Sequence, residues 1–233
     1  MKYILQYALF SIVLVLATPV VADSVEDGLK AYADGDYATA LRIFRPLAEQ
    51  GNADAQIKLG LMYEFGEGVT QDDKETVKWY RRAADQGVAL VQHKLGLMYE
   101  TGKGVTQDYK EAVKWYHLAA EQGVADAQLS LGLMYNLGQG VTQNDKEAVK
   151  WIQLAADQGV ALAQGRLGNM YYYGEGVTQD YIQAHVWFNL AAANEASKEW
   201  RNNATQARDA VAGKMTPEQI AEAQRLASEW RPK

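Results

Sequence analysis

Histidines are the side chains of this chain best suited to acid–base or metal chemistry. There are three, His93, His117 and His185, and they fall in three different predicted helices. None belongs to the HExxH pair with which a helix holds zinc in metalloproteases. The chain has no cysteine, which excludes a thiol nucleophile, a disulfide framework and a Cys-ligated metal. We therefore predict no metal site, no cofactor and no catalytic residue.

Two further motifs recur along the chain and contain residue types that could bind a ligand. The sequence GxGVTQ starts at Gly66 and returns three more times, but it lacks the Lys-Ser/Thr pair of a phosphate-binding P-loop. A short polar side chain follows each copy, namely Asp72, Asp108, Asn144 and Asp180. These could be ligands, but an acidic side chain also stabilises a helix N-terminus by about 0.3–1 kcal/mol. Asparagine serves equally well as an N-cap, so we interpret these four residues as structural.

A segment that recurs every 36 residues carries both motifs. Its copies start at Leu59, Leu95, Leu131 and Leu167, and the first reads LGLMYEFGEGVTQDDKETVKWYRRAADQG. Apolar residues at helical spacing predict a helix A before the glycines and a helix B after them. Thr70, with Asp73 three residues later, resembles a capping box at the start of helix B. Hairpins of this kind bury their apolar faces only by stacking, which predicts a solenoid.

The chain divides into a leader, five hairpin units and a C-terminal cap. The predicted units are residues 24–51, 52–87, 88–123, 124–159 and 160–195 of a single solenoid that covers residues 23–233. Two further helices, about 197–211 and 216–230, are expected to cover the last unit within a capping segment 197–230. Thr216 followed by Pro217 is a strong helix start.

Glycine and aromatic residues recur inside the predicted helices. Gly60 and its counterparts lie in the middle of helix A, where glycine costs roughly 1 kcal/mol relative to alanine. We expect a Trp or Tyr of helix B to press against each of these glycines. An aromatic stripe could instead bind sugar or peptide, but the fixed helical positions favour a core role. The recurring aromatics are Tyr63, Tyr99, Tyr135, Tyr171, Trp79, Trp115, Trp151 and Trp187.

The pattern AxxxLGxMYxxGxGVxQDxxxAxxWxxxAAxxG resembles the SEL-one-like repeat (SLR) family, a relative of the tetratricopeptide repeats. The resemblance covers about residues 24–230 and implies an all-α, right-handed α/α solenoid of antiparallel helix hairpins. It also implies a non-catalytic scaffold that binds other proteins. Some cysteine-rich secreted members resemble penicillin binders with weak β-lactamase activity. This chain has neither cysteine nor a Ser-x-x-Lys tetrad, which argues against that activity. A cell-wall or β-lactam-binding protein with weak hydrolase activity is therefore kept only as the alternative to the scaffold.

The N-terminus has the composition of a secretory signal peptide. Lys2 precedes an apolar run from Ile4 to Leu16, and Val20 and Ala22 suit a cleavage site before Asp23. We therefore predict a signal peptide over residues 1–22 and an exported protein, periplasmic or secreted, with an uncleaved anchor as the alternative. The run is short for a bilayer span of about 20 residues, so we expect no membrane span after cleavage. The net charge of −6 argues against nucleic acid as a partner, and we expect a monomer.

Comparison of the four copies with one another predicts where a protein or peptide would bind. On helix A, positions 54, 57, 58, 61 and 65 and their counterparts change from copy to copy and share one face. We expect this face to line a concave groove with an apolar floor and basic side chains. The alternative is that its leucines pack against the next helix. The predicted partner-binding residues are Ile57, Lys58, Leu61, Phe65, Leu90, His93, Lys94, Leu97, Leu129, Ser130, Leu133, Leu137, Arg166, Asn169 and Tyr173.

Overall fold

The computed structural model describes residues 24–194 and 197–232, which form twelve α-helices and no strand. This confirms the all-α fold class. The predicted signal peptide, residues 1–22, lies outside the described residues. The helices are α1 (Val25–Ala33), α2 (Tyr37–Glu49), α3 (Ala53–Phe65), α4 (Asp73–Asp85), α5 (Ala89–Thr101), α6 (Tyr109–Glu121), α7 (Ala125–Leu137), α8 (Asp145–Asp157), α9 (Ala161–Tyr173), α10 (Tyr181–Asn194), α11 (Lys198–Ala212) and α12 (Pro217–Glu229).

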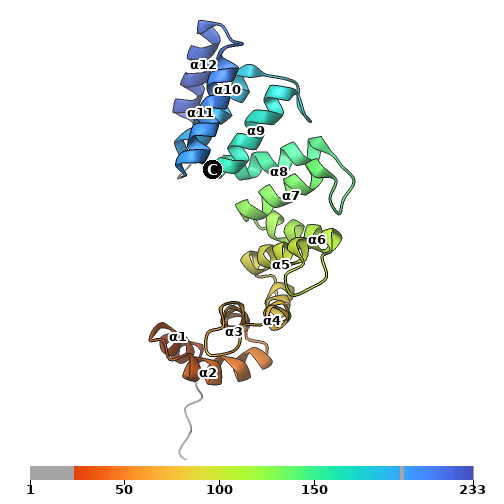
Figure 1. Cartoon of the computed structure of the whole chain (residues 1–233), viewed down its shortest axis with the longest axis vertical. Helices are drawn as coiled ribbons and strands as arrows, with labels where there is room; N and C mark the ends of the chain where they lie inside the picture. Colours follow the sequence, from red (N-terminus) through yellow and green to blue (C-terminus); the bar gives the residue numbers. More distant parts are fainter. Residues whose placement is uncertain (1–23, 195–196, 233) are drawn as a thin grey trace, which may run out of the picture.

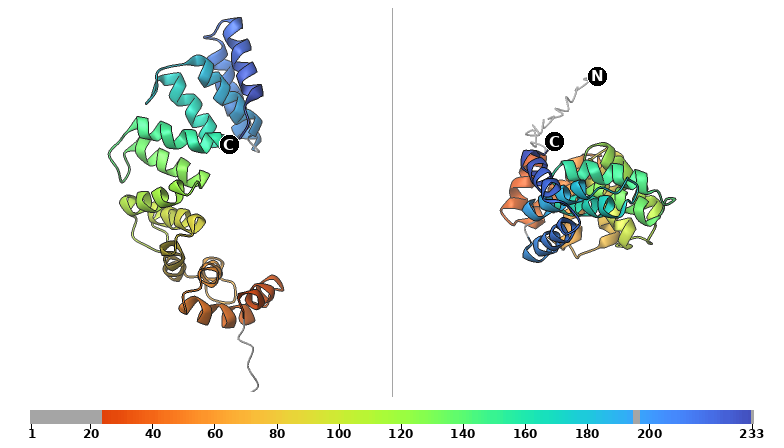
Figure 2. Two further views of the ribbon diagram at one scale, coloured as in Figure 1. Left: turned by 180° about the vertical axis from the view of Figure 1, so that it is seen from behind. Right: turned by 90° about the horizontal axis from the view of Figure 1, so that it is seen from above.

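Consecutive helices pair as hairpins, and the hairpins stack in sequence order. Figure 1 shows an open arc with α1 and α2 at one end and α11 and α12 at the other. The same arc is seen from behind in Figure 2. Helices α3, α5, α7 and α9 are the A helices of the repeats, and α4, α6, α8 and α10 are the B helices. The arrangement confirms the predicted solenoid.

Helix B begins two residues later than a cap at Thr70 requires. In α4, the N-cap is Asp72, whose side chain accepts hydrogen bonds from the backbone amides of Lys74 and Glu75. Asp108 and Asn144 make the same two bonds in their repeats, and Asp180 accepts one from Gln183. The structural interpretation of these residues is therefore confirmed, and the capping box at Thr70 is wrong. Asp72 is directly adjacent to the first helical residue, so it reaches both free amides.

The mid-helix glycine of each A helix lies against a large side chain of its B helix. A Cβ atom on Gly60 would lie 2.6 Å from the Tyr80 ring, and one on Gly96 would lie 2.6 Å from the Tyr116 ring. Ile152 and Phe188 occupy the same place in the next two repeats. The close approach is thus confirmed, with the residue after each tryptophan as the contact. The expected Trp or Tyr is wrong for two of the four glycines, because Gly132 meets Ile152 and Gly168 meets Phe188. The tryptophans themselves are buried in the core.

A buried glutamine ladder joins successive hairpins. Gln92 donates from Nε2 to the carbonyl of Ala84 in the preceding hairpin (3.0 Å) and accepts from Gln122 of its own hairpin (2.8 Å). The same two hydrogen bonds recur at each junction: one to a carbonyl of the preceding hairpin, and one between two amide side chains 30 residues apart. These pairs are Gln56 with Gln86, Gln92 with Gln122, Gln128 with Gln158, and Gln164 with Asn194.

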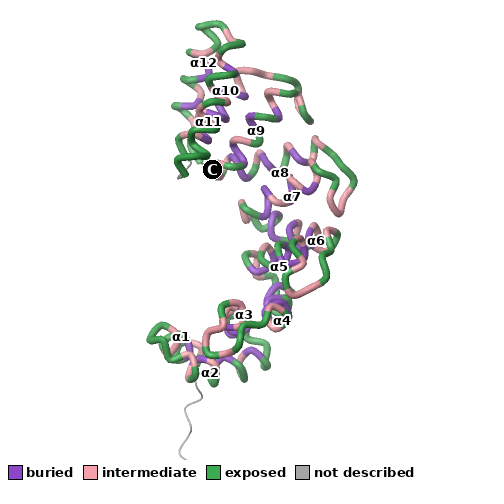
Figure 3. The backbone as a smooth tube through the Cα atoms, viewed as in Figure 1, coloured by how far each residue is buried: buried purple, intermediate pink, exposed green. Residues whose placement is uncertain are grey.

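The last two helices cover the C-terminal end of the stack. Thr216 caps α12 through a full capping box, as the Thr-Pro start predicts. Ala223 and Ala227 of α12 share a buried cluster with Trp187 and Leu190 of α10. Figure 3 shows buried segments along the contacts between helices and exposed segments on the outer surface of α11 and α12. The solenoid therefore ends on an exposed surface.

Candidate partner-binding surface

The varying face of the A helices exposes large apolar side chains. Five predicted residues stand out, with exposed fractions of 47% to 68%: Phe65, Leu90, Leu97, Leu137 and Tyr173. Isolated apolar residues are common on protein surfaces, but a series on successive parallel elements is typical of a binding surface. In Figure 1, α3 and α5 lie nearer the inner side of the arc than their partners α4 and α6. We call this set of side chains the A-helix surface.

Part of the predicted floor belongs to the core instead. Leu129 is 7% exposed and lies within a buried cluster with Leu167 of the next hairpin. Its prediction as a partner contact is therefore wrong, because its side chain fills the space between two stacked hairpins. Ile57, Leu61 and Leu133 are partly buried and pack against the core clusters, so the alternative of packing on the next helix applies to them in large part.

The cations of the A-helix surface have different environments. Lys58 lies 5.2 Å above the centre of the Tyr32 ring. Lys94 lies 3.5 Å from a carboxylate oxygen of Glu64, so its charge is balanced within the chain. Among the described residues, Arg166 has neither a hydrogen bond nor an ion pair. Arg166 is thus the predicted cation with the most freedom to bind an anion.

A cleft of about 370 Å³ lies where the first two repeats meet, beside Lys94 and Leu97. The Tyr80 hydroxyl donates to Glu64 at 2.5 Å. Burial, together with that hydrogen bond and the negative charge of Glu64, raises the pKa of Tyr80 far above its ordinary value. Lys103 adds a second cation, 3.3 Å from Asp73. Because the two lysines already pair with two carboxylates, this network joins repeats and carries little net charge.

The histidines have no shared site. His93 is partly buried with its ring 5.5 Å from that of Tyr116, and burial lowers its pKa. His117 is half-exposed, with Nδ1 3.5 Å from Glu121. His185 is buried between α10 and α11, where burial and the Arg208 cation lower its pKa. Within the described residues no group of three or more His, Cys, Asp or Glu side chains could hold a metal ion.

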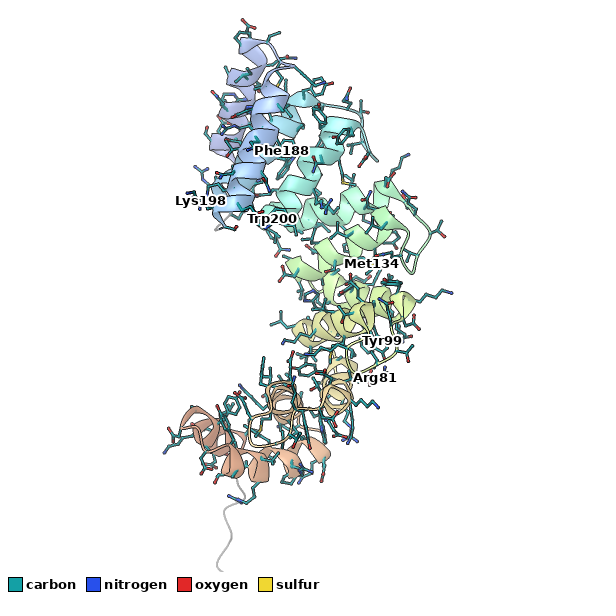
Figure 4. The ribbon with its side chains drawn as sticks, in the orientation of Figure 1. Arg81, Tyr99, Met134, Phe188, Lys198 and Trp200 are labelled. Atoms are coloured by element: carbon teal, nitrogen blue, oxygen red, sulfur yellow. The ribbon has the colours of Figure 1, made fainter. Side chains whose placement is uncertain are left out.

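Two predicted residues remain, Ser130 on α7 and Asn169 on α9. Ser130 is partly exposed on α7. Asn169 lines a cleft with Arg166 between α9 and α11. Trp200 of α11, which is 56% exposed, lines the same cleft and was not predicted. Figure 4 labels Trp200 and Phe188 of α10, both of which line this cleft. The sequence offered one indication of Trp200, namely that it is a large aromatic residue outside the repeated pattern.

The repeats match a known family along most of their length. The Sel1 repeat matches residues 53–88, 89–124, 125–160 and 161–195, which together exceed half of the chain. The chain belongs to the Sel1 repeat family. Each Sel1 repeat contains one A helix and the B helix that follows it.

Solved structures of other Sel1 repeat proteins have the same fold. The chain is 33% identical to c5321, a protective antigen of uropathogenic Escherichia coli with an SLR fold, with a TM-score of 0.75. That match covers 89% of this chain and 45% of c5321. A Sel1 repeat protein from Oxalobacter formigenes is 27% identical, with a TM-score of 0.70, over 89% of this chain and 100% of the relative. The predicted resemblance and solenoid are thereby confirmed.

A curated relative shares only a short segment. An exopolysaccharide production negative regulator from Rhizobium leguminosarum bv. viciae is 41% identical over 58 residues, which are 25% of this chain and 22% of the regulator. The chain thus spans less than half the length of both c5321 and the regulator. Sel1 repeat proteins typically act as non-catalytic scaffolds for protein–protein interaction. No helix in the described part of this chain is long and apolar enough to cross a membrane.

Proposed function

We propose that this Sel1 repeat chain is an exported, monomeric scaffold that binds a protein or peptide along its A-helix surface. The observation that carries this proposal is the series of exposed apolar residues on that surface, from Phe65 through Leu97 to Tyr173. Exposing such residues is unfavourable in water, and covering them with a partner is favourable at about 25 cal/mol per Å² of apolar area. The B helices, by contrast, expose only Leu118 and Leu154 of their large apolar residues, at 38% and 41%.

Affinity purification with a matched pair of variants tests the binding surface. Leu97→Glu places a charge on the A-helix surface, and Leu154→Glu makes the same change at a similarly exposed site on helix B. We expect wild-type and Leu154→Glu proteins to recover the same envelope protein, and Leu97→Glu to lose it. Equal recovery by all three, or by none, would count against the proposed surface.

Export to the periplasm or the medium rests on the signal sequence over residues 1–22. Its short apolar run and the small residues before Asp23 support cleavage at that point. Intact-mass measurement of the protein purified from the cell envelope or medium tests this proposal. A mature chain that begins at Asp23 is the expected result. A full-length chain found in the cytosolic fraction would contradict export.

A further inference from the structure

The last Sel1 repeat differs from the others where it meets α11. A cleft of about 260 Å³ lies between α9 and α11, with α10 at its base. Gly165 lines this cleft, and its counterparts in the earlier repeats are Ile57, His93 and Leu129. A Cβ atom on Gly165 would meet only the Ala191 side chain, at 4.0 Å. The missing side chain therefore leaves open a space that a side chain occupies in the other repeats.

The polar groups of this cleft are unpaired. Arg166, Asn169 and Asn203 line it, and within the described residues none of the three forms a hydrogen bond or an ion pair. None of the residues that line it is acidic. Elsewhere on the A-helix surface Lys94 is balanced by Glu64. In a chain of net charge −6, a cation without a counter-charge beside two free amides favours an anionic group.

The rest of the lining is apolar and accessible. Leu162 is 43% exposed and Trp200 is 56% exposed, on opposite sides of the cleft, and Phe188 lies below them. The volume is below the roughly 300–1,000 Å³ of sites that hold whole drug-sized ligands. It suits a single residue with an apolar side chain and one negative group.

We propose that this cleft binds the C-terminal residue of a partner peptide, an apolar residue with a free α-carboxylate. This inference rests on the proposed function, because the cleft continues the A-helix surface. The Arg166 guanidinium has the fork of donors that pairs with a carboxylate, and the two amides can donate further hydrogen bonds. The apolar side chain would contact Leu162 and Trp200. A C-terminal apolar residue carries both groups on one carbon atom, whereas an internal acidic residue would need a second residue to supply the apolar contact.

An array of random decapeptides attached by their N-termini tests the proposal with purified protein. We expect the retained peptides to end in Leu, Ile, Val, Met or Phe. Amidation of their C-termini, or Arg166→Gln in the protein, should each weaken binding at least tenfold, the effect expected for a charge-assisted hydrogen bond. Gly165→Leu, which restores the side chain of Leu129, should abolish binding. Lys150→Gln, at an exposed cation of helix B outside the cleft, should leave it unchanged.

Circular dichroism and thermal unfolding of each variant check that it folds. If Gly165→Leu fails to fold, the amidation and Arg166→Gln comparisons still decide the question. Equal binding of free-acid and amidated peptides, or no effect of Arg166→Gln, would overturn the carboxylate site. Binding that remains sensitive to Leu97→Glu in that case would leave the proposed function standing. Retention of no peptide would also overturn the site, while the envelope purification tests the proposed function separately.

Discussion

Gly96 and Gly165 both lie within A helices, but their surroundings differ. A Cβ atom on Gly96 would lie 2.6 Å from the Tyr116 ring, whereas one on Gly165 would meet only Ala191, at 4.0 Å. Neither glycine has the positive φ that an added side chain would strain. The repeated glycine at position 96 is therefore a packing residue, and the one at position 165 leaves open space.

Alanine should have opposite effects at these two positions. We expect Gly96→Ala to lower the free energy of unfolding by about 1–3 kcal/mol, because the ring and the helix must move apart. Gly165→Ala should raise it by about 0.4–1 kcal/mol, because alanine is the better helix former. Urea unfolding followed by circular dichroism measures both values. A stabilising effect of Gly96→Ala would contradict the packing role.

His185 should make the fold sensitive to acid. Its Nδ1 is buried without a hydrogen-bond partner among the described residues, and burial with the Arg208 cation lowers its pKa while Asp209 opposes the shift. As the pH falls below about 6.5, the unfolded chain therefore binds a proton before the folded chain does, and stability decreases. His93, also with a lowered pKa, adds to the same trend.

The corresponding measurement is the free energy of unfolding between pH 7.5 and pH 5. We expect it to decline toward pH 5 in the wild type and to decline less in His185→Leu, which cannot take up a proton. Identical pH profiles for the two proteins would show that His185 does not contribute.

At the scale of elements, the sequence predicts the helix pairs and the glycine turns that end them. Each A helix ends at a left-handed glycine, such as Gly66 with φ of 73°, and the conformational freedom of glycine makes such ends visible in a sequence. The glutamine ladder was not predicted. Its glutamines recur visibly in the sequence, but half of the groups that accept their hydrogen bonds are backbone carbonyls. Every residue has a backbone carbonyl, so the sequence does not indicate which ones accept. Only the stacking of hairpins brings these groups together.

The ladder should contribute measurably to stability. Gln92→Leu removes two hydrogen bonds, the one that Gln92 donates to Ala84 and the one that it accepts from Gln122. At about 0.5–1.5 kcal/mol for each bond, the cost is about 1–3 kcal/mol. We expect a loss of that size in the free energy of unfolding. Gln71→Leu, at an exposed turn position, should change stability by less than about 0.5 kcal/mol. Equal effects of the two substitutions would contradict the ladder's role.

At the scale of the molecule, the stacking geometry decides which residues reach a partner. Variation among the repeats predicted the face that carries Leu97 and Leu137, and both are exposed. Variation among the repeats did not distinguish these exposed leucines from the buried Leu129. A position at the edge of a helix face is buried or exposed according to how the next hairpin packs. Trp200 was missed because it comes from the cap, which has no counterpart among the repeats. The exposed apolar series and the final cleft together extend along the A helices from α3 to α9 and reach α11 of the cap.

Site-specific photo-cross-linking in living cells tests the A-helix surface most directly. A photoreactive residue would replace Leu97 or Leu137 on the A helices, and Leu118 or Leu154 on the B helices as matched exposed controls. We predict that the two A-helix positions capture the same envelope protein and that the two B-helix positions do not. Capture of that protein mainly from Leu118 and Leu154, or equally from all four positions, would contradict binding along the A helices.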